Sequence, residues 1–220
     1  MSLEKLSGER RERRDPTQEL LELALNEELS DEELAPMVRQ AIDDGADVNV
    51  ETIVVDEDDD SSVEDNGCVC TYPVLHLFFR SGRLECIDEL LLKNVDLEKT
   101  NSLGYTALQL AVDASSVLSS PESKVVKIVR QLLLAGADID AGAGAGMMYA
   151  AQSRFSPIIF ATYSQQPKLV QELLRWKKKP NLEECRVANI GTALALAVSL
   201  GNEEIIRHLI KAGAKLEARK

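Results

Sequence analysis

The chain has few aromatic residues and few histidines. Only 4% of its 220 residues are Phe, Trp or Tyr, and it contains two histidines. A core must therefore be built mainly from Leu, Ile, Val and Ala, which favours closely packed helices. Both His76 and His208 lie on predicted helices, where packing explains them better than general-base work. We therefore expect no catalytic site and no enzyme.

Long apolar runs and an export signal are also missing. The longest runs, such as 157–161 and 193–198, fall far short of the roughly 18 residues that a membrane helix needs, so no membrane-spanning segment is expected. The N-terminal MSLEKLSGERRERRD has no apolar stretch behind its charges and is not expected to be a secretory signal. The four cysteines are interpreted as thiols of a reducing compartment, which predicts a cytoplasmic or nuclear location.

The negative charge is concentrated in one block. Residues 16–70 hold 18 acidic residues and a single basic one, whereas residues 71–220 hold 15 acidic and 19 basic residues. The block is expected to attract a basic protein partner, and it argues against direct binding of nucleic acid. The acidic residues of its densest run predicted to contact such a partner are Asp56, Asp58, Asp59 and Asp60.

The same acidic run has two other interpretations. A calcium loop that starts at Asp56 would need Gly at its sixth position and Glu at its twelfth, but Ser61 and Gly67 stand there. Calcium is therefore excluded. A solvated acidic loop without a dedicated partner remains an alternative to the binding site.

Three stretches end a predicted helix with nearly the same turn. The stretches LLLAGADID, AIDDGADVN and LIKAGAKLE place Gly136, Gly45 and Gly213 directly after an apolar helix. Glycine takes the left-handed conformation at a helix end cheaply because it has no Cβ atom. The glycines are therefore predicted helix stops. LLLKNVDLE has Asn94 in place of glycine, and Asn is the next most tolerant residue of that conformation.

Upstream of these turns lie four copies of one helix start. They read YPVLHLF, YTALQLA, FSPIIFA and GTALALA, and their first helical turns are predicted at residues 73, 106, 156 and 192. A base period near 33 with local insertions fits the spacing. With these starts and turns the chain resembles the ankyrin-repeat family over roughly residues 17–220. The resemblance implies an all-α ankyrin-repeat solenoid of about five helix-turn-helix repeats with finger loops.

The domain organisation follows from the same register. A charged tail occupies 1–16 and the repeat domain 17–220. The expected parts of the repeat domain are a degenerate capping repeat at 17–49, an acidic loop insertion at 50–71, and repeats at 72–100, 101–140, 141–184 and 185–220. In the capping repeat, Ser30 and Glu33 are predicted to form a capping box at the start of the second helix.

The resemblance also implies a binding surface. The residue before the first three helix starts is Tyr72, Tyr105 or Phe155, and Gly191 precedes the fourth. In ankyrin stacks this position lies on the concave side near the fingers. We expect the three rings to form an exposed aromatic column suited to a protein partner, although rings that only shield the finger bases are the alternative. The residues expected to flank the column, near the ends of the first helices, are Arg80, Asp113, Tyr163 and Leu200.

Other candidate sites are weaker. Cys68, Cys70, His76 and Cys86 could in principle hold zinc, but C-x-C is a poor zinc spacing, and no metal is expected. AGAGAG at 141–146 lacks the Lys and Ser or Thr of a phosphate loop and is interpreted as a finger. The basic stretch Arg175–Lys179 is interpreted as cations that complement a helix C-terminus. No cofactor and no small-molecule substrate are expected.

The sequence thus predicts a non-catalytic protein-protein interaction module. The aromatic column would dock a segment of the partner, and the acidic region would speed the encounter. Two alternatives stay open: an acidic escort for a strongly basic protein of ribosomal or histone type, and the targeting domain of a longer enzyme or adaptor that is cut at Lys220.

Overall fold

The computed structural model describes residues 15–55, 69–102, 104–117, 122–141, 155–183 and 191–215. Within these residues lie ten α-helices and one two-stranded sheet. The first helices of successive pairs are α1 Pro16–Ala24, α3 Val74–Arg80, α5 Ala107–Val117, α7 Pro157–Tyr163 and α9 Ala193–Leu200. The second helices are α2 Asp31–Asp43, α4 Leu84–Leu91, α6 Glu122–Ala135, α8 Pro167–Arg175 and α10 Glu203–Lys211.

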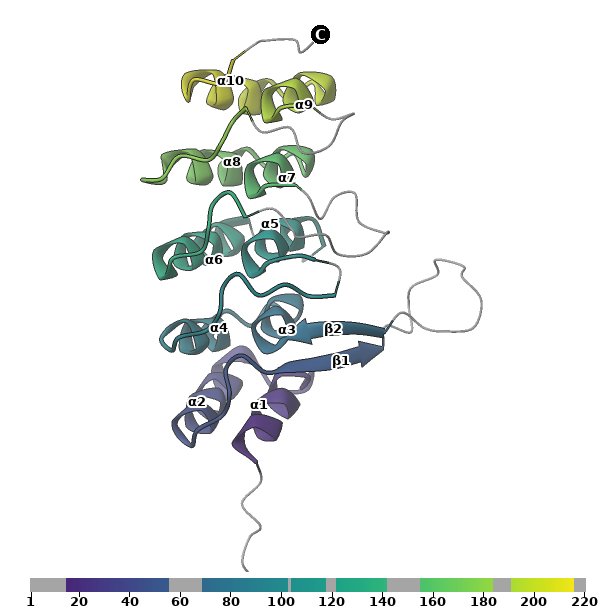
Figure 1. Ribbon diagram of the computed structural model, residues 1–220, viewed down its shortest axis with the longest axis vertical. Helices are drawn as coiled ribbons and strands as arrows, with labels where there is room; N and C mark the ends of the chain where they lie inside the picture. The colour runs from purple at the N-terminus through teal and green to yellow at the C-terminus, as the bar shows by residue number, and fades with distance from the viewer. Residues whose placement is uncertain are drawn as a thin grey trace, which may run out of the picture.

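The helices form two columns that run the length of a single stack (Figure 1). Each first helix packs against the second helix of its own pair, and each column is continuous because every helix also contacts its counterpart in the next pair. The first column faces the side on which the two strands project. Each pair is therefore one layer that buries its apolar faces only against its neighbours.

All four predicted helix starts are confirmed. The helices α3, α5, α7 and α9 begin one residue after positions 73, 106, 156 and 192. Thr106 and Thr192 each accept a hydrogen bond from the backbone N–H three residues on, at 3.3 Å in both cases. The predicted capping box at α2 is present too, with Ser30 and Glu33 bonded reciprocally. Each side chain satisfies a backbone donor that the first helical turn leaves without a partner.

The glycine stops are confirmed, and the prediction for Asn94 is wrong. Gly45, Gly136 and Gly213 have φ values of 101°, 106° and 98°. Among the described residues, the one non-glycine with positive φ is Gln165, so Asn94 is not left-handed. The chain instead leaves α4 through a tight turn in which the Val95 N–H donates to the Lys93 carbonyl at 2.7 Å. This turn needs no residue with positive φ.

A ladder of polar side chains links the turns of neighbouring layers. The turns after α2, α4, α6 and α8 each carry polar residues at two positions, i and i+2, and the first accepts the N–H of the second. The second reaches up to a backbone N–H of the next turn. These contacts join Asn49 to Asp96 at 2.7 Å, Glu98 to Asp138 at 2.8 Å, Asp140 to Asn181 at 2.7 Å and Glu183 to Lys215 at 2.9 Å.

The predicted acidic loop insertion at 50–71 is partly a β-hairpin, which the all-α prediction missed. Strand β1 Glu51–Val55 pairs with β2 Val69–Pro73 in an antiparallel register that places Thr52 opposite Tyr72. Both strands are rich in β-branched residues, which favour extended backbone. The residues 56–68 between the strands lie outside the described part of the chain, as do the tail at 1–14 and most of the glycine-rich finger.

The core is mainly aliphatic, as the shortage of aromatic residues indicated, and it also holds Tyr72 and all four phenylalanines. Its members are drawn from every helix, and α8 shows the pattern: Leu169, Val170, Leu173 and Leu174 line one face, and all four are buried. This spacing puts four apolar side chains on one stripe of the helix. Among the described helices, none is long and apolar enough to cross a membrane.

Candidate functional site

The predicted aromatic column is not an exposed surface, so that expectation is wrong. Tyr72 is 5% exposed and Phe155 is 2% exposed, whereas Tyr105 is half-buried. The rings belong to the core rather than to a surface ladder. Phe160 of α7 explains part of this burial, because its ring packs edge-on against both Tyr105 and Phe155, with ring centroids 5.8 Å apart in each case.

Hydrogen bonds between layers also hold the backbone carbonyls of Tyr105 and Phe155. His76 Nε2 donates to the Tyr105 carbonyl at 2.9 Å, and Gln109 Nε2 donates to the Phe155 carbonyl at 2.7 Å. His76 and Gln109 occupy equivalent places in α3 and α5. Each side chain therefore reaches from its own layer to the residue before the next helix start. The column thus connects one layer to the next.

Tyr72 is covered by one of the residues that were expected to flank it. The Arg80 guanidinium lies over the Tyr72 ring, 5.0 Å from its centroid, which is a cation–π distance. Arg80 ends α3 and is itself exposed. At this layer, the first column therefore exposes the Arg80 cation, which lies over the buried Tyr72 ring.

Several exposed residues of the first column lie near the C-terminal ends of their helices. We call Arg80, Tyr163, Val198 and Leu200 the helix-end row; they lie at or near the C-terminal ends of α3, α7 and α9. Tyr163 is 46% exposed and Val198 is 52% exposed, and Leu200 is half-buried. Of the predicted flanking residues, Arg80 and Tyr163 are thus exposed. Val198 was not predicted.

Tyr163 is the exposed end of an aromatic cluster. Its ring packs against Phe155 with centroids 6.1 Å apart, and Phe155 packs in turn against Phe160. A ring held in this way loses little further freedom when a partner covers it, which is typical of residues that dominate a protein interface. The side chain of Asp113 lies outside the described residues, and so do Asp56, Asp58, Asp59 and Asp60.

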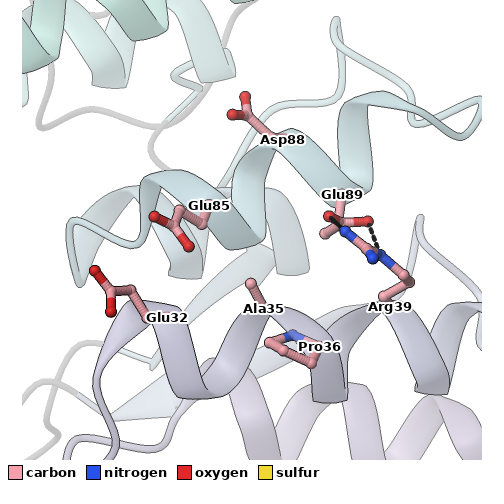
Figure 2. Close-up of a pocket in the computed structure, with 7 residues that line it drawn as sticks. All are labelled: Glu32, Ala35, Pro36, Arg39, Glu85, Asp88 and Glu89. Carbon is pink, nitrogen blue, oxygen red and sulfur yellow. Dashed lines mark hydrogen bonds and ion pairs between the residues drawn. The ribbon is translucent and has the colours of Figure 1, made fainter.

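A second candidate site is an acidic groove between α2 and α4 (Figure 2). It encloses about 260 Å³, and Ala35 and Pro36 of α2 form its apolar part. Its charged residues are Glu32 and Arg39 of α2 and Glu85, Asp88 and Glu89 of α4. Figure 2 shows the Glu32 and Glu85 side chains extending from neighbouring helices at one end of the groove.

Arg39, the single cation among the described residues of the acidic groove, is already neutralised. Arg39 donates to both carboxylate oxygens of Glu89, at 2.9 and 2.5 Å, and this pairing lowers the pKa of Glu89. Asp88 accepts a hydrogen bond from the Gln131 side chain, while burial raises its pKa. Glu32 and Glu85 are exposed. The groove therefore offers negative charge to a basic group and has no spare positive charge of its own.

Sequence reasoning identified the acidic block but missed this groove. Glu85, Asp88 and Glu89 are spaced by three and four residues and thus share one face of a helix, which is a readable signal. Whether these α4 residues lie beside Glu32 of α2 depends on how the two layers are aligned. The 50–71 insertion hides that register, because it breaks the base period.

Two of the residues considered for zinc, Cys86 and His76, are buried in different environments. Cys86 is a free and fully buried thiol whose pKa is raised by burial and by the nearby Asp31. His76 is committed to the Tyr105 carbonyl. Cys68 and the side chain of Cys70 lie outside the described residues. Within the described part of the chain, no three His, Cys, Asp or Glu side chains form a group that could hold a metal ion.

Two segments of the chain match a known family. Residues 103–143 and 191–220 match the family model of the ankyrin repeat. These two segments are similar to ankyrin repeats. Ankyrin repeats generally mediate protein-protein interaction and are typically not catalytic. The two matched segments include α5, α6, α9 and α10, and the layers between and before them show the same pairing of helices. A comparison with curated proteins returned no match.

Proposed function

We propose that the chain is a non-catalytic interaction module that binds a segment of a protein partner along the helix-end row. Tyr163 is the observation that carries this proposal, because it presents a large exposed ring on a rigid aromatic support. Arg80 and Leu200 supply a cation and an apolar side chain at equivalent ends of α3 and α9. Tyr72, Tyr105 and Phe155 then position these residues instead of touching the partner. The acidic region would add attraction for basic charge.

The same proposal includes the architecture and the location. Each helix pair would be one repeat, so that the five pairs form an ankyrin solenoid with α1 and α2 as its capping repeat. A solenoid offers an extended surface along one column of helices, and the helix-end row runs along such a column. The cytoplasm or the nucleus is the proposed location of the complex.

Site-specific photocrosslinking tests the helix-end row. A photoreactive phenylalanine analogue would replace Tyr163 in one variant and Leu134 in a control variant. Leu134 is a matched position, because it is 70% exposed but lies on α6 in the second column. We expect a defined adduct in cell lysate from position 163 and none of the same mass from position 134. Equal adducts from both positions would contradict the proposal.

The affinity of the captured partner provides a second readout. A Tyr163→Ala variant should weaken binding by about tenfold or more, because a central aromatic residue of an interface commonly contributes about 2 kcal/mol. A Leu134→Ala variant removes a comparable apolar side chain from the other column and should leave the affinity unchanged. Titration of the purified partner by calorimetry measures both.

The acidic groove favours a second candidate function, that of an escort for a strongly basic protein. Four carboxylate side chains from two layers line it, and its one cation is paired. In that function the double variant Glu32→Gln, Glu85→Gln would lose most of the binding, and so would replacement of Asp56 to Asp60 by Ser. If the helix-end row is the main site, the same changes would chiefly slow association, and Tyr163→Ala would remain the more damaging variant.

A further inference from the structure

A basic groove lies between α8 and α10, at the opposite end of the stack from the acidic groove. It encloses about 370 Å³. Gln171, Leu174 and Arg175 come from α8, and His208 and Lys211 from α10. Within each helix these residues are three or four positions apart, so two facing helical stripes make the walls. Lys179, just after α8, adds a third cation.

The charges of this groove are only partly used within the protein. None of the described residues that line it is acidic. Lys179 donates to the Leu174 carbonyl, and His208 lies 3.7 Å from Glu204 of its own helix. Across the described residues, Arg175 and Lys211 have no ion-pair partner. The carboxylate nearest in sequence to Arg175 is Glu172, which Arg130 of α6 binds through both oxygens at 2.8 and 3.0 Å. The charge of Arg175 contributes less than Arg130 to the lowered pKa of Glu172.

Neutralisation of helix ends does not account for the whole arrangement. Cations near the C-termini of α8 and α10 do offset the partial negative charge there, and the contact of Lys179 with the Leu174 carbonyl is of this kind. Offsetting the charge of a helix C-terminus requires no groove, and it does not require cations from two layers to lie close together. Here they surround a floor that contains Leu174, on a chain whose net charge is −12.

We propose that the basic groove binds an acidic peptide segment of a partner protein, with carboxylates against Arg175 and Lys211. The guanidinium of Arg175 can hold a carboxylate through two hydrogen bonds. The cations are spread over two helices, which suits several separate carboxylates better than one compact phosphate. Phosphate sites typically use the backbone N–H groups of a helix N-terminus, whereas this groove lies at two C-termini. The leucine floor accommodates the methylene groups of a Glu side chain.

This site is independent of the proposed function. The basic groove belongs to the second column of helices, and the helix-end row belongs to the first. A partner could therefore occupy either site alone, and failure of one leaves the other in place. The groove also has a built-in reporter, because Trp176, the single tryptophan of the chain, directly follows Arg175 and is half-buried.

Titration with a blocked hexaglutamate peptide tests the proposal. Fluorescence of Trp176 and anisotropy of a labelled peptide would be followed on the full chain at low salt. We expect saturable binding that Arg175→Gln and Lys211→Gln each weaken by about tenfold, since each removes a direct charge-assisted contact. Arg207→Gln is the matched control, because Arg207 is a cation of α10 outside the groove that pairs with Glu203. It should change the affinity by less than about twofold.

Three results would overturn the proposal. The first is a loss in Arg207→Gln as large as that in Arg175→Gln, which would show a diffuse charge effect. The second is tighter binding of inorganic phosphate, phosphatidylserine vesicles or oligothymidylate than of the peptide. The third is no binding of the peptide up to millimolar concentration. Circular dichroism of each variant separates loss of binding from loss of folding, and Lys211, exposed in the last turn of α10, is the safer substitution.

Discussion

At the scale of single residues, His76 stands out because a buried imidazole links two layers. It is 1% exposed, and burial lowers its pKa from 6.5 to about 4. His76 Nε2–H donates a hydrogen bond to the Tyr105 carbonyl, and burial keeps the ring neutral in the folded state. Protonation therefore favours the unfolded state, in which the histidine regains its ordinary pKa.

The lowered pKa of His76 predicts how the free energy of unfolding depends on pH. The unfolded chain binds the extra proton between pH 6.5 and about 4, so the free energy of unfolding should fall through this window as pH falls. The whole shift corresponds to about 3 kcal/mol. Urea denaturation at pH 7, 6 and 5 measures the slope. A flat profile above pH 5 would contradict the prediction.

A His76→Gln variant is the direct control for that measurement. Gln109 already fills the equivalent place in α5 and donates to the Phe155 carbonyl, so Gln at position 76 can keep the hydrogen bond and remove the titration. The variant should lose the slope between pH 7 and 5. A His208→Gln variant, which changes the other histidine of the chain, should keep it.

The residue scale also shows where sequence reasoning succeeds and where it fails. The sequence predicts Thr106, Ser156 and Thr192 as N-caps, because capping depends on a few neighbouring residues. Thr106 and Thr192 do cap their helices, but the Ser156 side chain makes no capping hydrogen bond. The burial of Tyr72 and Phe155 could not be read locally. It depends on Arg80 lying over one ring and on Phe160 packing against the other, and Phe160 is one turn away in the core of α7.

At the scale of helices and turns, α4 is capped by a residue from another layer. Its own N-cap residue, Arg83, makes no capping hydrogen bond through its side chain. Asp31 of α2 accepts the Glu85 N–H at 2.9 Å and the Cys86 N–H at 3.3 Å instead. A carboxylate at this place also complements the positive end of the helix.

An Asp31→Ala variant should therefore lose stability beyond its own helix. We expect a loss of about 1 kcal/mol, the usual cost of a removed cap. Thermal or urea unfolding would measure it, and Glu32→Ala, one residue along the exposed surface of α2, is the matched control with little expected effect. Hydrogen exchange at the start of α4 should rise in Asp31→Ala. An unchanged exchange rate there would show that the cap is dispensable.

The ladder between turns gives a second prediction at this scale. The Asn49 side chain accepts the Asp96 N–H and donates to the Asn94 carbonyl at 3.4 Å. Asn49→Ala should cost about 1 kcal/mol, because it leaves a turn donor without its partner. Asp44→Ala breaks only an exposed contact with Gln40 within α2 and should cost much less. Comparing the urea midpoints of the two variants decides the point.

The turns also show what element-level patterns can predict. Gly45, Gly136 and Gly213 were readable as stops because only their own conformation mattered. The role of the polar residues that follow them became visible only when successive turns were stacked. The hairpin arms β1 and β2 were missed because the acidic residues between them dominated the composition of the insertion.

At the scale of the whole molecule, charge is segregated along the stack. The acidic groove lies between the first two layers, and the basic groove lies between the last two. The sequence predicted the imbalance between 16–70 and the rest, because counting charges needs no structure. It did not predict the basic groove, since Lys211 meets Arg175 only when two layers stack.

This segregation predicts that salt stabilises the fold. Carboxylates crowd the N-terminal layers, and their repulsion is screened over about 10 Å at 0.1 M salt. The urea midpoint should therefore rise between low and moderate sodium chloride concentrations. The double variant Glu32→Gln, Glu85→Gln should show a smaller rise, because it relieves the same repulsion. A midpoint that falls with salt would mean that ion pairs such as Arg39–Glu89 outweigh the repulsion.

The ladder of turn contacts has a mechanical consequence. Its links follow one another from the first layer to the last, and each joins only two neighbouring turns. A pulling force along the axis of the stack therefore loads them in series, so every link bears the same tension. The molecule should then lengthen in discrete steps, one layer at a time, and behave as a short extensible spring.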